Sequence, residues 1–380
     1  MKISVSDRSF IDNAWQNLDS KLIKIAVKSR NKIPQVSING EHNDLSSFNR
    51  IAGWTNGFWG GLMWIMYAGT NNLEYKITAE KSGELLDQAF LQVDQLNHDV
   101  GFMWHITSGA EYTLTGNKKA RNRNLLASMI LASRYEAKGE FIRAWNDTWR
   151  DMDTTGWTII DCMMNSAQLY WASEITGDMR FRRIAEKHAD MTMKDHVREN
   201  GSVNHIVVHD SEKSNTVLRI EGGQGFSVGT SWSRGCAWAV YGFVISYIHT
   251  GKKEYLQTAI KCADYFLKEV EKTGYLPLCD FDQPATPVYY DASAGAITAC
   301  GLIELGKVLD EDNGEKYLSG AINILKIITE KCVDFTDNDD CVVKMNTGSY
   351  GDRVHETVIY SDFFYAEALL KLKGSKFFIW

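Results

Sequence analysis

Very little in this sequence can interrupt an α-helix. Only four of its 380 residues are proline, the residue that most strongly breaks helices. Apolar residues recur every three or four positions through long segments, which is the period of a helix with one buried face. This pattern predicts about twelve helices, at residues 6–30, 58–69, 73–95, 102–115, 118–137, 160–175, 179–194, 231–249, 253–271, 292–309, 313–331 and 359–372.

Strand-like segments are few. The runs at 204–210 and 216–220 flank a polar turn, which is typical of a small β-hairpin. The expected fold class is therefore all-α, with one β-hairpin near residues 204–220.

The helices follow a weak internal repeat. Thr-Gly pairs end helices at 115–116, 176–177 and 250–251, where glycine supplies the left-handed position that stops a helix. A unit of about 60 residues with two helices would fill the chain six times, as an open solenoid or a closed ring of helix pairs. Irregular loops rich in Gly, Trp, Asp and His precede several helices. These loops would converge at one end of a closed barrel, and long loops of this kind usually carry function.

Charge and cysteine content exclude several classes of protein. The formal net charge is −7, which argues against nucleic-acid and anionic-membrane partners, because both need a basic face. No stretch approaches the roughly 20 apolar residues of a membrane helix, and the first residues do not look like a secretory signal. The seven cysteines form no CxxC pair, so we expect reduced, buried thiols in a cytoplasmic protein.

Two aspartates are candidate acid/base groups. Asp99 precedes an apolar helix, so it is either an N-cap or a functional carboxyl. Asp161 lies in the apolar run TIIDCMMN, where an unpaired charge is rarely buried. It is either a buried carboxyl with an arginine or N–H partner, or a desolvated carboxyl whose raised pKa suits proton transfer near neutral pH.

The loops also carry candidate ligand-binding groups. Trp54 and Trp238 stand among several tryptophans in or beside the loops. Such side chains are either core residues or flat surfaces for a sugar ring. Arg234 in SWSRG suits either a carboxylate ligand or a structural ion pair. His205 and His209 are spaced for a metal pair only on a helix, and their segment favours a strand. We therefore expect no metal and no cofactor.

Five motifs, in order along residues 50–372, resemble those of the unsaturated glucuronyl hydrolases, glycoside hydrolase family 88. They are HDVGFMW, TIIDCMMN, SWSRGCAWAVYGF, DASAGAITACGLIEL and YSDFFYAEALLKL. The resemblance implies an (α/α)6 barrel, a closed ring of six helical hairpins, with residues 1–380 as a single catalytic domain. It also implies release of a 4,5-unsaturated glucuronic acid from lyase-generated glycosaminoglycan disaccharides by hydration of the C4=C5 double bond.

The same resemblance implies roles for individual residues. Asp161 would be the general acid/base, and Asp99 the second essential aspartate, oriented by His98. The remaining candidates would contact the substrate: His205, Gln224, Arg234, Trp54 and Trp238.

Some positions depart from the family pattern. Cys236 stands where a glutamine is common, and Tyr290 precedes Asp291 where a basic residue is usual. The loop 346–356 lies where relatives select for sulfate on the neighbouring sugar, and here it offers Ser349, Arg353 and His355.

Two other functions are compatible with the sequence. One is a related unsaturated rhamnogalacturonyl hydrolase, which would act on pectin fragments. The other is a non-catalytic sugar-binding helical module. The sequence leaves open whether the protein is a monomer or a homodimer.

Overall fold

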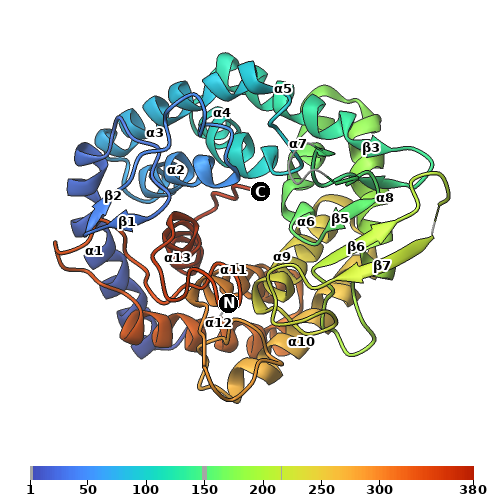
Figure 1. Ribbon diagram of the computed structural model, residues 1–380. Helices are drawn as coiled ribbons and strands as arrows, with labels where there is room; N and C mark the ends of the chain where they lie inside the picture. Colours follow the sequence, from blue (N-terminus) through green and yellow to red (C-terminus); the bar gives the residue numbers. More distant parts are fainter. Residues whose placement is uncertain (1–2, 148–151, 215) are drawn as a thin grey trace.

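The chain folds into a double ring of helices (Figure 1), as a computed structural model shows; it describes residues 3–147, 152–214 and 216–380. The inner ring is formed by α2 (Phe58–Thr70), η3 with α4 (Gly101–Gly109, Ala110–Thr115), α6 with α7 (Cys162–Asn165, Ala167–Thr176), α9 (Ser233–Thr250), α11 (Ala292–Val308) and α13 (Ile359–Leu372). The outer ring is formed by α1 (Val5–Lys28), α3 (Leu73–Leu86), α5 (Lys118–Ser133), α8 (Met179–Asp195), α10 (Lys253–Glu271) and α12 (Glu311–Lys331). The expected (α/α)6 barrel is confirmed.

The two rings differ in how their helices are buried. Outer helix α10 buries one stripe, from Tyr255 through Ala259 and Cys262 to Phe266 and Val270, as an amphipathic helix does. Inner helix α9 is buried on all sides from Ser233 to Ser246, because it packs against its outer partner, its two inner neighbours and the centre of the ring. The apolar period in the sequence therefore predicted the outer helices directly.

The Thr-Gly junctions end inner helices as expected. Gly116, Gly177 and Gly251 adopt φ values of +72°, +73° and +72° at the C-caps of α4, α7 and α9. The next outer helix begins within two residues; Asn117 and Asp178 cap α5 and α8 with their side chains. Each inner helix therefore runs toward this end of the barrel, and the start of each inner helix lies at the opposite end.

The predicted hairpin gains a third strand that the sequence did not reveal. Strands β6 (Ile206–His209) and β7 (Val217–Glu221) pair as expected, and β5 (Trp157–Ile159) adds to β6 in antiparallel register. Residue 215, in the turn, lies outside the described residues. Ile159 is opposite Ile206, and Ile160 N–H donates to the carbonyl of His205 at 3.1 Å. This pairing brings Asp161 beside His205.

The remaining elements are short. Four strands have two residues each. Strand β1 (Ser37–Ile38) pairs with β2 (Glu41–His42), and β3 (Tyr135–Glu136) pairs with β4 (Phe141–Ile142). The 3₁₀ segment η1 (Trp54–Gly57) precedes α2, and the 3₁₀ segment η2 (Asp87–Gln92) extends α3. The segment η3 is a π-helix. Within the described residues no helix is long and apolar enough to cross a membrane.

The C-terminal segment enters the centre of the ring (Figure 1). Trp380 is buried, stacks on Phe364 with ring centroids 6.1 Å apart, and donates its indole N–H to Glu367 at 3.0 Å. Glu367 in turn pairs with buried Lys371. These contacts fill the centre of the ring beneath the end where the inner helices begin.

Candidate active site

The candidate site is a cavity of about 500 Å³ at the end of the barrel where the inner helices begin. Its walls come from the segments that precede α2, η3, α6, α9 and α13, so residues far apart in sequence meet there. Six of the eight predicted site residues line it: Trp54, His98, Asp99, Asp161, His205 and Gln224.

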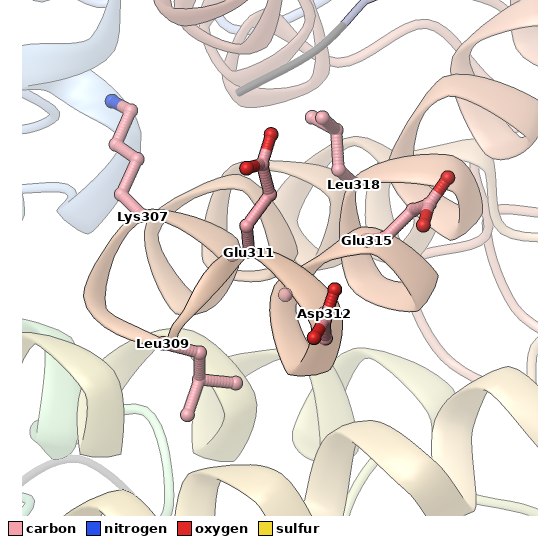
Figure 2. Close-up of a pocket in the computed structure, with 8 residues that line it drawn as sticks. Lys307, Leu309, Glu311, Asp312, Glu315 and Leu318 are labelled. Atoms are coloured by element: carbon pink, nitrogen blue, oxygen red, sulfur yellow. The ribbon is translucent and has the colours of Figure 1, made fainter.

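A second cavity, of about 620 Å³, lies at the turn between α11 and α12. Figure 2 shows Glu311, Asp312 and Glu315 on the first turns of α12 beside Lys307. These carboxylates are exposed at a helix N-terminus, where acidic side chains stabilise the helix dipole. This groove contains none of the predicted site residues.

Asp99 is a buried carboxyl and does not cap a helix. Its Oδ1 accepts from Asn165 Nδ2 at 3.3 Å and lies 3.6 Å from His98 Nε2. Burial, with a further contribution from the charge of Asp161, raises the pKa of Asp99 to about 8. His98 is itself buried, which lowers its pKa well below the usual value, so it stays neutral near pH 7.

Asp161 lies between β5 and α6, and its side chain is only 16% exposed. Its Oδ1 is buried without a hydrogen-bond partner, a costly arrangement that points to function. Burial raises the pKa of Asp161 to about 7, against the opposing effects of the Arg234 charge and the Trp238 N–H. A carboxyl with this pKa is poised to give and take a proton near neutral pH.

His205 is oriented by the turn at Gly223 and Gln224. The backbone N–H of Gln224 donates to His205 Nδ1 at 3.0 Å, so in the neutral ring the proton is on Nε2. That nitrogen lies 3.7 Å from Asp161 Oδ1. The ring also packs on Trp232, with centroids 4.1 Å apart. His205 therefore presents an N–H donor beside the Asp161 carboxyl.

Trp54 forms an aromatic wall of the cavity. Its ring packs against Tyr360 at 5.1 Å and Phe102 at 5.7 Å between centroids, and the side chain is half-buried. A rigid indole beside two carboxyls is suited to bind the apolar face of a sugar.

The chain is similar over nearly its whole length to known enzymes. An unsaturated glucuronyl hydrolase from Bacillus sp. (strain GL1) is 32% identical, covering 94% of this chain and 97% of the relative. An unsaturated chondroitin disaccharide hydrolase from Streptococcus agalactiae serotype III (strain NEM316) is 30% identical over 98% of both chains. The crystal structure of the Bacillus sp. GL1 unsaturated glucuronyl hydrolase matches with a TM-score of 0.88 and 29% identity, over 95% of this chain and 97% of that one.

The chain belongs to the unsaturated glucuronyl hydrolase family. The resemblance inferred from the five motifs is confirmed, as is the expectation that the chain is a hydrolase. No family model matches the chain, so membership rests on these whole-length similarities.

Arg234 does not line the cavity of this family member. It is only 1% exposed, forms an ion pair with Asp291, and donates to the carbonyls of Thr347 at 2.9 Å and Gly348 at 2.7 Å. These contacts are those of the structural ion pair that the sequence left open as an alternative, and the expected contact of Arg234 with a substrate carboxylate stays a prediction. Among the described residues, Arg50 and Arg353 are the arginines that line the cavity.

Trp238 is the other predicted site residue that is absent from the cavity lining, and its expected contact with the substrate stays a prediction. It is fully buried in the core, against Phe102 at 5.2 Å and Phe364 at 5.5 Å between ring centroids. Its indole N–H favours the ionised form of Asp161 and so lowers the pKa of that carboxyl. Of the two predicted tryptophans, Trp54 lines the cavity in this structure.

Asn165 is a site residue that sequence reasoning missed. Its Oδ1 accepts Phe102 N–H at 2.8 Å, while its Nδ2 donates to Asp99 Oδ1 and to the Asp161 carbonyl at 3.4 Å. The residue stands in the quoted TIIDCMMN motif, one helical turn after Asp161, and that spacing was the available signal.

A metal-dependent mechanism has no obvious ligand set here. Within the described ranges no group of three or more His, Cys, Asp or Glu side chains could hold a metal ion. His209 is occupied elsewhere, since its Nε2 lies 3.1 Å from Asp195 Oδ2.

Proposed function

We propose that this chain releases the 4,5-unsaturated glucuronic acid from the non-reducing end of glycosaminoglycan disaccharides made by lyases. One observation carries the proposal: the buried carboxyl of Asp99 and the partly buried carboxyl of Asp161 face one cavity beside a tryptophan, with pKa values raised toward neutrality. The names of the two relatives, a glucuronyl and a chondroitin disaccharide hydrolase, support this class of substrate.

In the proposed mechanism Asp161 acts first as an acid and then as a base. Its proton goes to C4 of the double bond, which leaves positive charge at C5 shared with the ring oxygen. Water adds to C5 and gives its proton to the Asp161 carboxylate. The hemiketal formed at C5 opens to a ketone, and the hemiacetal left at C1 releases the neighbouring sugar. One carboxyl with a pKa of about 7 supports both transfers.

Neighbouring residues support this chemistry. Protonated Asp99 can hold sugar hydroxyls through its remaining lone pairs and its O–H. The Nε2–H of His205 stabilises the Asp161 carboxylate as it forms. Gln224 and Trp54 line the cavity, where an amide can bind a sugar hydroxyl and an indole can stack on the ring. Arg50 and Arg353 give the wall positive charge that suits an acidic sugar.

The test is a panel of unsaturated disaccharides followed by near-ultraviolet absorbance of the double bond. Chondroitin, hyaluronan and heparin disaccharides, each with and without sulfate where it occurs, are compared with unsaturated galacturonyl-rhamnose. We expect bleaching with at least one glycosaminoglycan disaccharide. Turnover of galacturonyl-rhamnose alone would assign the chain to pectin degradation, and no bleaching at all would contradict the proposal.

A cytoplasmic location stays part of this proposal. All seven cysteines are buried as free thiols, the state expected of a protein in a reducing compartment.

A further inference from the structure

We propose that the barrel carries a second, non-catalytic binding site for an acidic oligosaccharide, at the end opposite the active site. This site is a groove of about 900 Å³ between α4, α5 and α7. Its lining residues are Tyr112, Thr113, Gly116, Lys118, Arg121, Trp171 and Ile175. None of them lines the active-site cavity, so binding in the groove can be measured without any turnover.

The groove forms where three helix ends meet. The inner helices α4 and α7 end at the caps Gly116 and Gly177, which mark the end of the barrel opposite the active site. The outer helix α5 begins two residues after Gly116 and packs against both inner helices (Figure 1). Side chains from three helices therefore line one space, although they are distant in sequence.

Two aromatic rings form one wall of the groove. Tyr112 and Trp171 are partly exposed, and their rings meet edge to face, with centroids 6.2 Å apart and an angle of 84° between the planes. The indole also packs against the buried ring of His105, at 6.2 Å between centroids. An indole held in this way is suited to bind the C–H face of a sugar ring, and the hydroxyls of Tyr112 and Thr113 can bond to sugar hydroxyls.

Two cations of α5 line the same groove. They are Lys118 and Arg121, and among the residues that the structure describes no carboxylate lies within ion-pair distance of either side chain. A guanidinium binds a carboxylate or a sulfate through two parallel hydrogen bonds, and an ammonium adds a point charge. The groove is therefore suited to an anionic ligand.

The acidic residues of these three helices do not neutralise the groove. Helices α4 and α7 contain one acidic residue each, and α5 contains none. Glu111 of α4 is buried and pairs with Arg123. Glu174 of α7 accepts from His249 Nδ1 at 2.7 Å. Neither carboxylate lines the groove, which is therefore positively charged in a chain whose net charge is −7.

The combination of rings and cations selects the class of ligand. A neutral sugar would leave both cations unpaired, and a simple anion would leave the aromatic wall uncovered. An acidic oligosaccharide can place a sugar ring on Trp171 and a carboxylate or sulfate on Lys118 and Arg121. A nucleotide fits less well, because Tyr112 stands nearly perpendicular to the indole and the two rings cannot enclose a flat base between them.

The first experiment locates the bound sugar by amide hydrogen exchange in the full chain. The probe is a sulfated chondroitin tetrasaccharide without a double bond. We expect slower exchange at residues 110–121 and 171–176, and an affinity that falls as salt is added. Chitotetraose, a neutral tetrasaccharide, and ATP are the comparison ligands. The proposal would be overturned if the chondroitin probe left these residues unprotected, if chitotetraose protected them equally, or if ATP alone protected them.

The second experiment measures the affinity of variants for the same probe by calorimetry. We expect Lys118→Gln combined with Arg121→Gln to weaken binding in the groove at least about tenfold, because charge-assisted hydrogen bonds are lost. On whichever disaccharide the wild type turns over, this double variant should keep the wild-type kcat/KM.

The matched control is Lys253→Gln. Lys253 is exposed and begins α10 as Lys118 begins α5, but it does not line the groove. This variant should bind the probe as the wild type does. Equal affinity of the double variant and the wild type would refute the second site, and a fall in kcat/KM that accompanies the loss of binding would refute its separation from catalysis.

Discussion

The substitution Gly223→Ala tests the orientation of His205 directly. Gly223 has φ +60°, and a Cβ placed on it would lie 2.1 Å from His205 Nδ1. The ring would have to retreat by more than about 1 Å to reach ordinary contact distance, and the Gln224 N–H would lose its acceptor.

Two effects set the expected loss of stability in Gly223→Ala. A left-handed alanine costs about 1–2 kcal/mol relative to glycine, and the lost hydrogen bond costs about 1 kcal/mol more. We therefore expect the free energy of unfolding to fall by about 2–3 kcal/mol. A displacement of about 1 Å in a group beside the acid/base carboxyl lowers kcat/KM by about a hundredfold.

The matched control is Gly229→Ala in the same loop. Gly229 has φ +84°, but its Cβ would meet no atom within 4 Å. This variant should lose stability through its backbone alone and keep its activity. Urea unfolding gives the stability, and bleaching of the double bond gives kcat/KM. If Gly223→Ala and Gly229→Ala retain the same activity, the Gln224 N–H does not orient His205 for catalysis.

Two further predictions concern the carboxyls. Asp161→Asn should reduce turnover by at least about a hundredfold while leaving disaccharide binding by calorimetry largely unchanged; an active variant would exclude Asp161 as the acid/base. Asp99 has its pKa raised to about 8 in the folded chain, from an ordinary value of 3.8, so the folded state holds a proton that the unfolded chain releases above about pH 4. The stability that this proton contributes is complete below about pH 4 and is lost as the pH rises through 8. The free energy of unfolding of Asp99→Asn minus that of the wild type should therefore be more positive at about pH 9 than at about pH 5. Urea unfolding at both pH values measures this difference, and an equal difference at the two would refute the raised pKa of Asp99.

The helices could be predicted from sequence, and the small sheet only in part. All twelve predicted segments contain a helix, because burial of one face imposes a local period that the chain displays. The three residues of β5 have no such local signal. They are a strand because β6, almost fifty residues later, pairs with them, and that pairing places His205 beside Asp161.

The candidate site, like the small sheet, could be predicted from sequence only in part. Residue type and position in the loops were sufficient to find Asp99, Asp161 and Trp54, since carboxyls and indoles before apolar helices are conspicuous in the sequence itself. Whether a side chain faces the cavity or lies beneath it depends on neighbours from other helices. Arg234 and Trp238, predicted to bind the ligand, are buried and absent from the cavity lining, and their contact with the substrate stays a prediction, while Asn165 and Arg50 were overlooked.

The sequence by itself determined a nearly proline-free succession of helices, their glycine-terminated ends and the residue types available for acid/base chemistry on a sugar. Only the tertiary structure decided which of those residues meet in one cavity, and which are desolvated enough to carry a proton near pH 7. The physical reason is that periodicity and capping are local properties of the chain, whereas burial, and the pKa shift that it causes, depend on the packing of segments distant in sequence.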